Sequence, residues 1–388
     1  MKNALRHAAL AALAASVLIG CTSNGNKTSD VSSSGTQPGE IVLGCISPFT
    51  GTNADYGNQT KRGAELAVDE INAGGGIKGK KLRFVYEDDQ GLAKNGPTAL
   101  QKLASIDKVP AVLGPFQSTV VIPTAKTAEQ LHVVILSASA TADSIKDAGD
   151  YTFRIVPPNA RQGQTAASFA KDVLHAKRAA IMPINDDYGK SIAAAFARSF
   201  TSGGGTIVDQ EPFNAGTRDF RTLLTKVAAS SPDVVFFPGN YEETGTLLKQ
   251  AKQLSVQGAF LGSDSQMSPE FLKLAGSAAE GTFYTNIGMG RKTTDPLIKG
   301  FRTAFQKKYG GDPTTFEAYA YDAVMVLANA VKVSDGTADG IKAALYNTKN
   351  FAGVTGPISF DSFGEVDRDF AVEKVTNGQF SEVDRAGN

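Results

Sequence analysis

The stretch Ile41-Val42-Leu43-Gly44-Cys45-Ile46, followed by Ala54-Asp55-Tyr56-Gly57, has a counterpart later in the chain. There, Ala179-Ala180-Ile181-Met182 is followed by Asp186-Asp187-Tyr188-Gly189. Each copy runs from an apolar strand through a polar loop into Asp-Tyr-Gly, where a helix is predicted to begin. Because the same order of features occurs twice, we expect two halves of similar plan.

Strands and helices alternate beyond both copies of this stretch. Each predicted helix ends in a glycine run, Gly74–Gly76 or Gly203–Gly205, suited to the positive φ needed past a helix end. The further strands are predicted at Lys81–Asp88, Val109–Gly114 and Val133–Ser137 in the first half, and at Thr206–Glu211, Asp233–Gly239 and Ala259–Gly262 in the second. This alternation predicts an α/β fold of two doubly wound lobes with mostly parallel sheets. Ligands of such sheets bind outside the carboxyl ends of the strands, so facing loops would enclose a cleft.

Length and charge limit the classes of protein to consider. The chain has 388 residues, of which 41% are hydrophobic, which is enough for two domains of ordinary size. Its 39 Lys and Arg residues balance 39 Asp and Glu residues. Removal of Lys2 and Arg6 with a signal peptide would leave a small negative charge. We therefore expect no nucleic-acid partner.

The amino terminus has the pattern of an export signal. Two basic residues precede the apolar run Ala8–Gly20, which is short for a membrane span and fits a signal peptide over residues 1–20. Leu18-Ile19-Gly20-Cys21 resembles a bacterial lipobox, in which the cysteine is lipidated and becomes the first mature residue. Residues 21–39 then form a polar tether. These features predict a periplasmic or extracytoplasmic protein anchored by lipid on Cys21; the alternative is an ordinary signal peptide with an incidental cysteine.

The sequence contains few catalytic or metal-binding patterns, and its many carboxylates leave a hydrolase disfavoured but not eliminated. It contains no Gly-x-x-x-x-Gly-Lys-Ser/Thr loop and no Gly-x-Ser-x-Gly elbow. His132 and His175 have no cysteine or histidine neighbours at metal-ligand spacing. Cys45 is the only thiol left once Cys21 is lipidated, so no intramolecular disulfide is expected. We expect Cys45 to be buried in a strand. We predict that the chain is not an enzyme and uses no cofactor and no metal.

The loops that follow the strands carry a coherent set of polar and aromatic side chains. Ser118 is a candidate N-cap, and a helix start with the Ser118 and Thr141 hydroxyls could hold a carboxylate. Asp264 ends a strand on the other side of the cleft and could pair with an ammonium group. Tyr56, Tyr188 and Tyr241 add apolar walls with polar tips. Taken singly, Ser118 could merely cap its helix, Asp264 could be a turn residue and the rings could be packing. Together they predict a site for a small uncharged amino acid, with an aliphatic one fitting best.

Several short motifs follow one another in a fixed order between Ile41 and about Phe380. They are Pro48-Phe49-Thr50-Gly51, Tyr56-Gly57, Ala67–Gly79, Asp88-Asp89, Gly114-Pro115, Ser137–Thr141, Asn185–Gly189, Asp219-Phe220, Ala320–Val324 and Gly356–Asp361. Each is weak alone, but their order makes the combination specific. With these motifs the chain resembles the periplasmic leucine/isoleucine/valine-binding proteins of branched-chain amino acid ABC transporters.

The resemblance implies a periplasmic binding protein-like fold with three crossovers between lobes, near Pro157, Ile287 and Phe360. It implies that residues 40–156 with 287–359 form one lobe and residues 157–286 with 360–388 the other. By matching motifs, Ser118 and Thr141 would hold the ligand carboxylate, and Asp264 with the backbone near Ser139 would hold the ammonium. The residues implied to line the side-chain pocket are Tyr56, Gln117, Tyr188, Tyr241 and Phe316.

The implied function is a solute-binding protein that delivers its ligand to ABC permease subunits. Nothing in the sequence indicates an obligate oligomer, so we expect a monomer. Two departures bear on the ligand: Asp264 is shorter than the Glu of some relatives, and Gln117 puts an amide beside the pocket. An amide or urea ligand is therefore an alternative. A ligand sensor for a signalling receptor, built on the same fold, is another.

Overall fold

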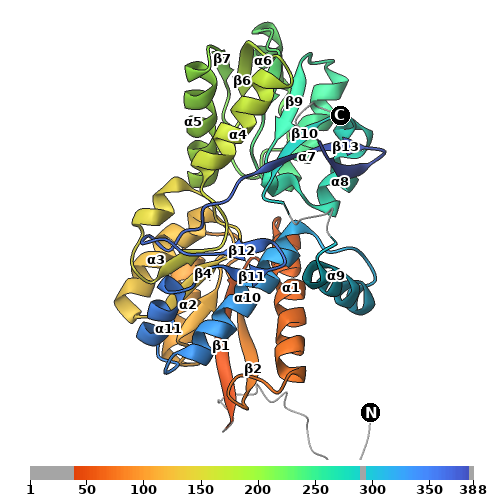
Figure 1. The fold of residues 1–388 in the computed structure, drawn as a ribbon. Helices are drawn as coiled ribbons and strands as arrows, with labels where there is room; N and C mark the ends of the chain where they lie inside the picture. The colour runs from red at the N-terminus through yellow and green to blue at the C-terminus, as the bar shows by residue number, and fades with distance from the viewer. Residues whose placement is uncertain (1–38, 289–293, 384–388) are drawn as a thin grey trace, which may run out of the picture. The chain divides into compact units, whose positions relative to one another are not determined.

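A computed structural model describes residues 39–288 and 294–383 (Figure 1). All of these residues belong to a single unit of the chain, Thr36–Asn388. The predicted signal peptide, Cys21 and nearly all of the tether lie outside the described residues.

Two sheets organise the described chain (Figure 1). The first has five parallel strands in the order β2-β1-β3-β4-β5. These are β1 (Glu40–Ser47), β2 (Lys81–Asp88), β3 (Ala111–Leu113), β4 (Val134–Ser137) and β5 (Thr152–Arg154). The second has seven strands in the order β14-β13-β10-β9-β8-β6-β7. These are β6 (Arg178–Ile181), β7 (Thr206–Gln210), β8 (Val234–Phe236), β9 (Ala259–Gly262), β10 (Phe283–Asn286), β13 (Ala371–Thr376) and β14 (Gln379–Glu382).

The two sheets repeat one another. The order β2-β1-β3-β4-β5 recurs as β7-β6-β8-β9-β10, with all neighbours parallel. The predicted duplication and the parallel sheets are therefore confirmed. The sequence did not predict β5, β10, or the antiparallel strands β13 and β14 that extend the second sheet. A separate two-stranded sheet joins β11 (Phe351–Gly353) to β12 (Gly356–Ile358).

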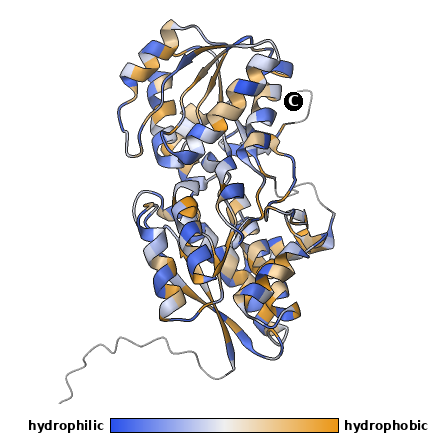
Figure 2. Ribbon diagram, turned by 90° about the vertical axis from the view of Figure 1, so that its left-hand side faces the viewer, coloured by the Kyte–Doolittle hydropathy of each residue, from blue (hydrophilic) through white to orange (hydrophobic). Residues whose placement is uncertain are grey.

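Helices cover the sheets, and Figure 2 shows largely hydrophobic strands flanked by helices that carry hydrophilic residues. The α-helices are α1 (Ala54–Ala73), α2 (Asn95–Ser105), α3 (Ser118–Leu131), α4 (Asn159–Asp172), α5 (Asp187–Ser202), α6 (Arg221–Ala229), α7 (Tyr241–Gln253), α8 (Pro269–Ala275), α9 (Pro296–Tyr309), α10 (Thr315–Val333) and α11 (Ala338–Tyr346). Short 3-10 helices lie at η1 (Asp143–Asp147), η2 (Asp264–Gln266) and η3 (Gly276–Ala279). The central strands are buried, and Cys45 is buried with a free thiol, as predicted.

The repeated Asp-Tyr-Gly has a packing reason in both halves. The first turn of α1 lies against the carbonyl oxygen of Pro48, and that of α5 lies against the carbonyl oxygen of Ile184. A Cβ atom at Gly57 or Gly189 would overlap these oxygens. Glycine therefore lets each helix begin close to the strand it follows, and each preceding tyrosine is held at the loop edge of its sheet.

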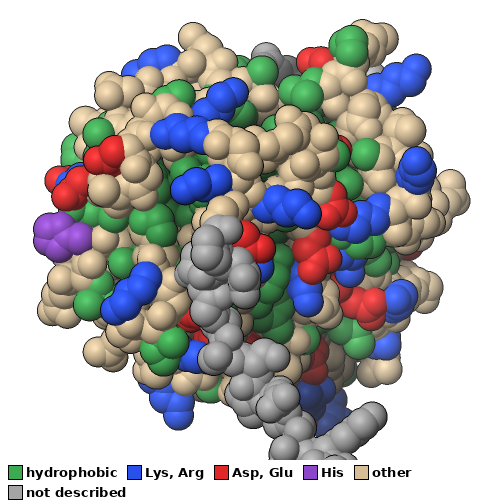
Figure 3. Space-filling model, turned by 90° about the horizontal axis from the view of Figure 1, so that it is seen from below, with side chains coloured by type: hydrophobic (Ala, Val, Ile, Leu, Met, Phe, Trp, Pro, Cys, Tyr) green, Lys and Arg blue, Asp and Glu red, His purple; other side chains and the backbone are tan. Residues whose placement is uncertain are grey.

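The chain passes between the two sheets three times: after β5, after β10 and between β12 and β13. Its later part returns to the five-stranded sheet, where α10 packs along α1. In Figure 3, basic and acidic side chains are interspersed over the face shown. Among the described residues, no helix is long and apolar enough to span a bilayer.

Candidate ligand-binding site

A small cavity of about 30 Å³ lies between loops that follow strands of the two sheets. Seven of the nine residues predicted to contact ligand line this cavity, and they come from both halves of the chain. They are Tyr56, Gln117, Ser118, Ser139, Tyr188, Asp264 and Phe316. The structure therefore gathers most of the predicted set around one space.

The two tyrosines of the repeated motif converge on the same short segment. Tyr56, from the half with the five-stranded sheet, is fully buried, and its hydroxyl donates to the carbonyl of Ser265 at 2.5 Å. The same hydroxyl accepts from the backbone N–H of Tyr241 at 3.1 Å. Tyr188 approaches from the other half and lies 3.2 Å from the Ser265 hydroxyl. The Tyr56 hydroxyl is thus engaged between the halves, which leaves its ring to face the cavity.

Asp264 is buried among neutral hydrogen-bond donors. Its Oδ1 accepts from Tyr188 at 2.9 Å and from the side-chain amide of Gln162 at 2.7 Å. The Gln162 amide also donates to Thr285. Burial raises the pKa of Asp264, although the hydrogen bonds act in the opposite direction. A carboxylate in this setting gains stability from a nearby cation, and an ammonium group has the required charge and size.

Ser118 does not cap its helix, so that prediction is wrong. Helix α3 begins at Ser118 itself, and the N-cap position is Gln117, whose side chain makes no capping bond. The Ser118 hydroxyl instead accepts the backbone N–H groups of Thr141 and Ala142, each at 3.1 Å. A hydroxyl has two acceptor positions and one proton to donate. With both acceptor positions used, the O–H of Ser118 is the group left for an anionic ligand.

Aromatic rings form the apolar wall of the cavity. Tyr56 stacks on Phe116 with ring centroids 4.6 Å apart, and Phe316 packs edge-on against Phe116 at 5.0 Å. Sequence reasoning did not single out Phe116. Its position directly before Gln117, in the loop after the third strand, was the signal that could have found it.

Two predicted residues do not line the cavity. Tyr241 packs edge-on against Tyr56 at 5.0 Å, and its hydroxyl donates to the carbonyl of Thr52. It therefore supports the Tyr56 ring from behind. Thr141 is fully buried beside Ser118, and its hydroxyl oxygen has no hydrogen-bond partner within the described residues. A buried hydroxyl without a partner is costly, which makes Thr141 a candidate for a ligand contact.

The cavity also contains side chains that sequence reasoning did not assign. Besides Phe116, these are Ala140, Asp186, Asn240 and Ser265. Asp186 caps α5 by accepting from the N–H of Gly189 at 2.8 Å, and burial raises its pKa to about 6. Ser139 donates from its hydroxyl to the carbonyl of Phe116 at 2.6 Å, so its side chain is already bonded within the same half. No group of three or more potential metal ligands occurs in the part of the chain that the structure describes.

Comparison with known proteins identifies the class. The family model described as periplasmic binding protein matches residues 40–379. The Leu/Ile/Val-binding protein BraC3 of Rhizobium johnstonii is 32% identical over 330 residues, which are 84% of this chain and 89% of that protein. The chain therefore belongs to the periplasmic binding protein family, among the substrate-binding proteins of branched-chain amino acid ABC transporters.

Solved structures agree with the fold. The branched-chain amino acid substrate-binding protein LivJ of Streptococcus pneumoniae, in complex with isoleucine, has a TM-score of 0.83 and 33% identity, covering 88% of this chain and 97% of LivJ. A substrate-binding protein of Desulfitobacterium hafniense in complex with leucine has a TM-score of 0.76 and 29% identity, covering 89% of this chain and all of that one. Members of this family are extracytoplasmic solute-binding proteins and not enzymes, so the predicted family, fold class and non-enzymatic role are confirmed.

Proposed function

We propose that this protein binds a branched-chain or another small uncharged amino acid in the cavity between its lobes and delivers it to the permease of an ABC importer. The observation that carries the proposal is Asp264, a buried carboxylate with neutral partners in the same cavity as Ser118 and a wall of rings. A zwitterion supplies both the cation that Asp264 lacks and an anion for the Ser118 and Thr141 hydroxyls.

The ligand carboxylate would lie at the start of α3, where free backbone N–H groups attract an anion. The O–H of Ser118 and the unpartnered hydroxyl of Thr141 would donate to it. Asp264 and the backbone near Ser139 would hold the ammonium group. Tyr56, Gln117, Tyr188 and Phe316 would surround the ligand side chain, with Phe116 as a further contact and Tyr241 as support for Tyr56.

Closure around the ligand follows from this division of contacts. A ligand that touches both lobes binds the closed form better than the open form and so shifts the population toward it. We propose the lobe bounds implied by the resemblance: residues 40–156 with 287–359, and 157–286 with 360–388. The proposal includes a monomeric protein, export by residues 1–20 and attachment to the membrane through lipid on Cys21.

An amide or urea ligand is a second candidate, favoured by one observation. Gln117 lines the cavity, and its Oε1 atom is buried without a partner in the described chain. This oxygen lies beside Gly91, so a ligand N–H group would satisfy it once the Gln117 amide turns toward the cavity, whereas a leucine side chain could not.

The test is a thermal shift screen of the soluble form beginning near Gly39, against leucine, isoleucine, valine, other amino acids, amides and urea. The protein should be unfolded and refolded first, so that a ligand carried from the cell does not mask the effect. A ligand at about one hundred times its Kd should add about 2.7 kcal/mol of stability. A response to amides alone would support the second candidate, and turnover of the ligand would contradict both.

A further inference from the structure

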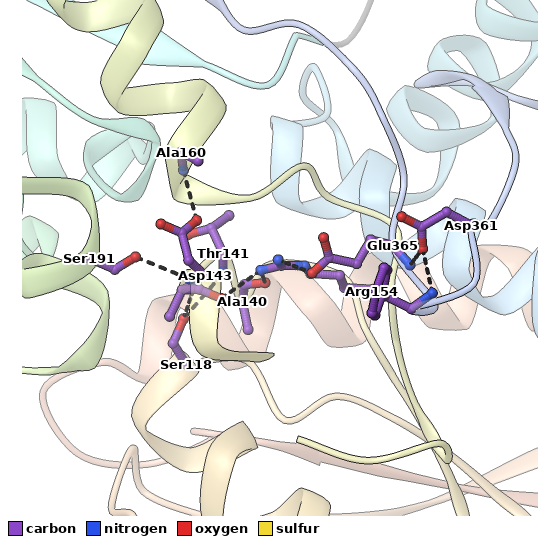
Figure 4. A network of polar contacts seen from close by, with 11 residues as sticks. Ser118, Ala140, Thr141, Asp143, Arg154, Ala160, Ser191, Asp361 and Glu365 are labelled. Atoms are coloured by element: carbon purple, nitrogen blue, oxygen red, sulfur yellow. Dashed lines mark hydrogen bonds and ion pairs between the residues drawn. The ribbon is translucent and has the colours of Figure 1, made fainter. Parts of the chain in front are cut away.

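A buried arginine lies next to the cavity and touches none of its open space. Arg154 is the last residue of β5, just before the first passage between the sheets, and is only 1% exposed. Figure 4 shows its guanidinium between the segment that carries Thr141 and the turn that carries Glu365. The two sides of this arginine therefore belong to two different parts of the chain.

On one side, Arg154 fixes the backbone on either side of Thr141. Its Nη1 donates to the carbonyl of Ala142 at 2.9 Å and to that of Ala140 at 3.4 Å. The N–H groups of Thr141 and Ala142 are held by the Ser118 hydroxyl. Arg154 thus binds carbonyls of this short segment, and Ser118 binds its backbone N–H groups from the opposite side (Figure 4). Together these bonds fix the position of the Thr141 hydroxyl.

On the other side, Arg154 is bonded to the third passage between the sheets. Its Nη2 pairs with the Glu365 carboxylate, and its backbone N–H donates to the carbonyl of Gly364 at 3.0 Å. Asp361 closes the turn by accepting the N–H groups of Phe363 and Glu365 at 2.8 and 2.9 Å. This turn lies between β12 and β13, so Arg154 ties a lobe connection to the segment around Thr141.

The ion pair is poorly explained as a device for stability. Burial lowers the pKa of Arg154 and raises that of Glu365, and in each case burial is the largest influence and outweighs the partner's charge. Buried ion pairs are often no more stabilising than neutral side chains of similar volume. A role that depends on the position of the guanidinium accounts better for a charged side chain buried here.

The segment also contacts the other half directly. The backbone N–H of Asp143 donates to the Ser191 hydroxyl of α5 at 3.1 Å, and the Asp143 carboxylate accepts from the N–H of Ala160 at the start of α4 at 2.8 Å. The segment is therefore bonded to the other half through Asp143, two residues after Thr141.

We propose that Arg154 is a positioning residue for the amino acid site, which holds Thr141 in place through Ala140 and Ala142 and is itself held by Glu365. The inference rests on the proposed function for its ligand, since Arg154 does not contact the cavity. Its effect is on affinity and on the order of the segment 139–143.

The test compares three variants with the wild type by calorimetry, using whichever ligand of the screen the wild type binds. Glu365→Gln leaves Arg154 without its counterion. Arg154→Met combined with Glu365→Gln removes both charges and the donors to Ala140 and Ala142. Arg154→Lys keeps the positive charge but replaces the planar, forked guanidinium with a single ammonium group. A matched control is Arg83→Met with Glu40→Gln, which removes the 3.2 Å ion pair at the far ends of β1 and β2.

We expect the double variant at Arg154 to melt close to the wild type yet to bind about tenfold more weakly, because two charge-assisted hydrogen bonds to the segment are lost. The control pair should leave the Kd unchanged. A purely structural role predicts instead that affinity follows melting temperature, so wild-type affinity in a stable double variant would overturn the proposal. If the double variant does not fold, the affinity of Arg154→Lys is the deciding measurement. Wild-type affinity of that variant would overturn the proposal.

A second measurement needs no ligand and separates this inference from the proposed function. Amide hydrogen exchange of residues 139–143 in the ligand-free protein should be about tenfold faster in Arg154→Lys than in the wild type, because the segment opens more readily. Unchanged exchange there would overturn the positioning role even if a ligand is found. Faster exchange in a protein that binds no screened ligand would leave the inference standing and count against the proposed function.

Discussion

Two buried charges on opposite sides of the cavity have different partners. Arg154, at 1% exposure, is paired with the Glu365 carboxylate and two backbone carbonyls. Asp264, at 3% exposure, accepts hydrogen bonds from Gln162 and Tyr188, which are both neutral. Both charges are buried near the same cavity, and Arg154 has a counterion whereas these hydrogen-bond donors of Asp264 carry no charge.

Under our two proposals, the difference separates a charge that maintains the site, Arg154, from one that would receive a ligand, Asp264. A buried ion without an opposite charge costs free energy, and hydrogen bonds from neutral groups offset only part of it. Arg154 has its counterion within the protein. Asp264 would acquire a counterion when an ammonium group binds. Binding would then remove the free-energy cost of the unpaired buried charge, and this gain would add to the affinity.

The largest expected effect on stability comes from removing the counterion of Arg154. Glu365→Gln should lower the free energy of unfolding by about 3 kcal/mol, because it leaves Arg154 buried without a counterion. Chemical denaturation of the ligand-free protein measures this. The exposed substitution Asp172→Asn on α4 is the control and should have no effect. A loss equal to that of the control would mean that water solvates Arg154 in the folded protein.

Removing the unmatched charge should have the opposite sign for stability. Asp264→Asn should leave the ligand-free protein as stable as the wild type or more stable, since a costly buried charge is lost. The same variant should weaken amino acid binding by about 2 kcal/mol, because the ligand ammonium loses its partner. Calorimetry and denaturation of one protein sample test both parts, and unaltered affinity would remove Asp264 from the site.

Asp186 is an intermediate case and predicts a pH dependence. Burial raises its pKa from 3.8 to about 6 in the folded protein, so the folded state binds more protons than the unfolded state between these values. Its contribution to stability is therefore most favourable below pH 4 and is lost as the pH rises through 6.

Asp186→Asn should be more stable than the wild type at pH 7 by about 1.5 kcal/mol, because asparagine caps a helix well without carrying the charge and partial exposure weakens the full effect. The difference should vanish as the pH falls toward 4. Melting temperatures across this range measure it, with Asp187→Asn, in the exposed first turn of the same helix, as the control. A difference that does not vary with pH would contradict the assignment.

The smallest effect is expected at the hydroxyl side. Thr141→Val keeps the volume of the side chain and removes the buried oxygen that has no partner. Binding should weaken by about 1 kcal/mol, because one hydrogen bond to the ligand carboxylate is lost, while unfolding changes little. Thr124→Val on α3, whose hydroxyl donates only within its helix, is the matched control. Equal affinities of Thr141→Val and the wild type would assign the carboxylate to other groups.

Much of the architecture was predictable because it depends on local pattern. The bounds of β2 and β9 were predicted as the structure has them, and β1 and β6 within a residue at each end. β3 and β8 are shorter than predicted, because regular pairing covers only Ala111–Leu113 and Val234–Phe236. Flanking residues such as Gly114 and Phe237 still donate a backbone hydrogen bond to the next strand. Strand β13 was missed, since its antiparallel pairing with β10 joins segments almost ninety residues apart. Strand β14, which pairs only with β13 through a tight turn, was missed with it.

The site was predictable in composition and less so in detail. Seven of nine predicted residues line one cavity, and their roles toward a ligand stay predictions. The cap assigned to Ser118 was wrong because its hydroxyl finds the backbone of a loop more than twenty residues away. Gln162 was missed because it lies on α4, outside the loops that follow the strands, and reaches Asp264 across 102 residues.

By itself the sequence determined the duplicated α/β plan, the glycine that each tyrosine precedes, and the kinds of side chain at the loop ends of the strands. These follow from periodicity and from steric limits that act between near neighbours. Only the tertiary structure decided that Tyr56 and Tyr188 meet at Ser265, that Asp264 has neutral partners and that Arg154 has Glu365. Such pairings depend on which distant segments pack together and exclude water. Burial raises the free energy of a charged side chain, so the group that compensates the charge matters more there than at the surface.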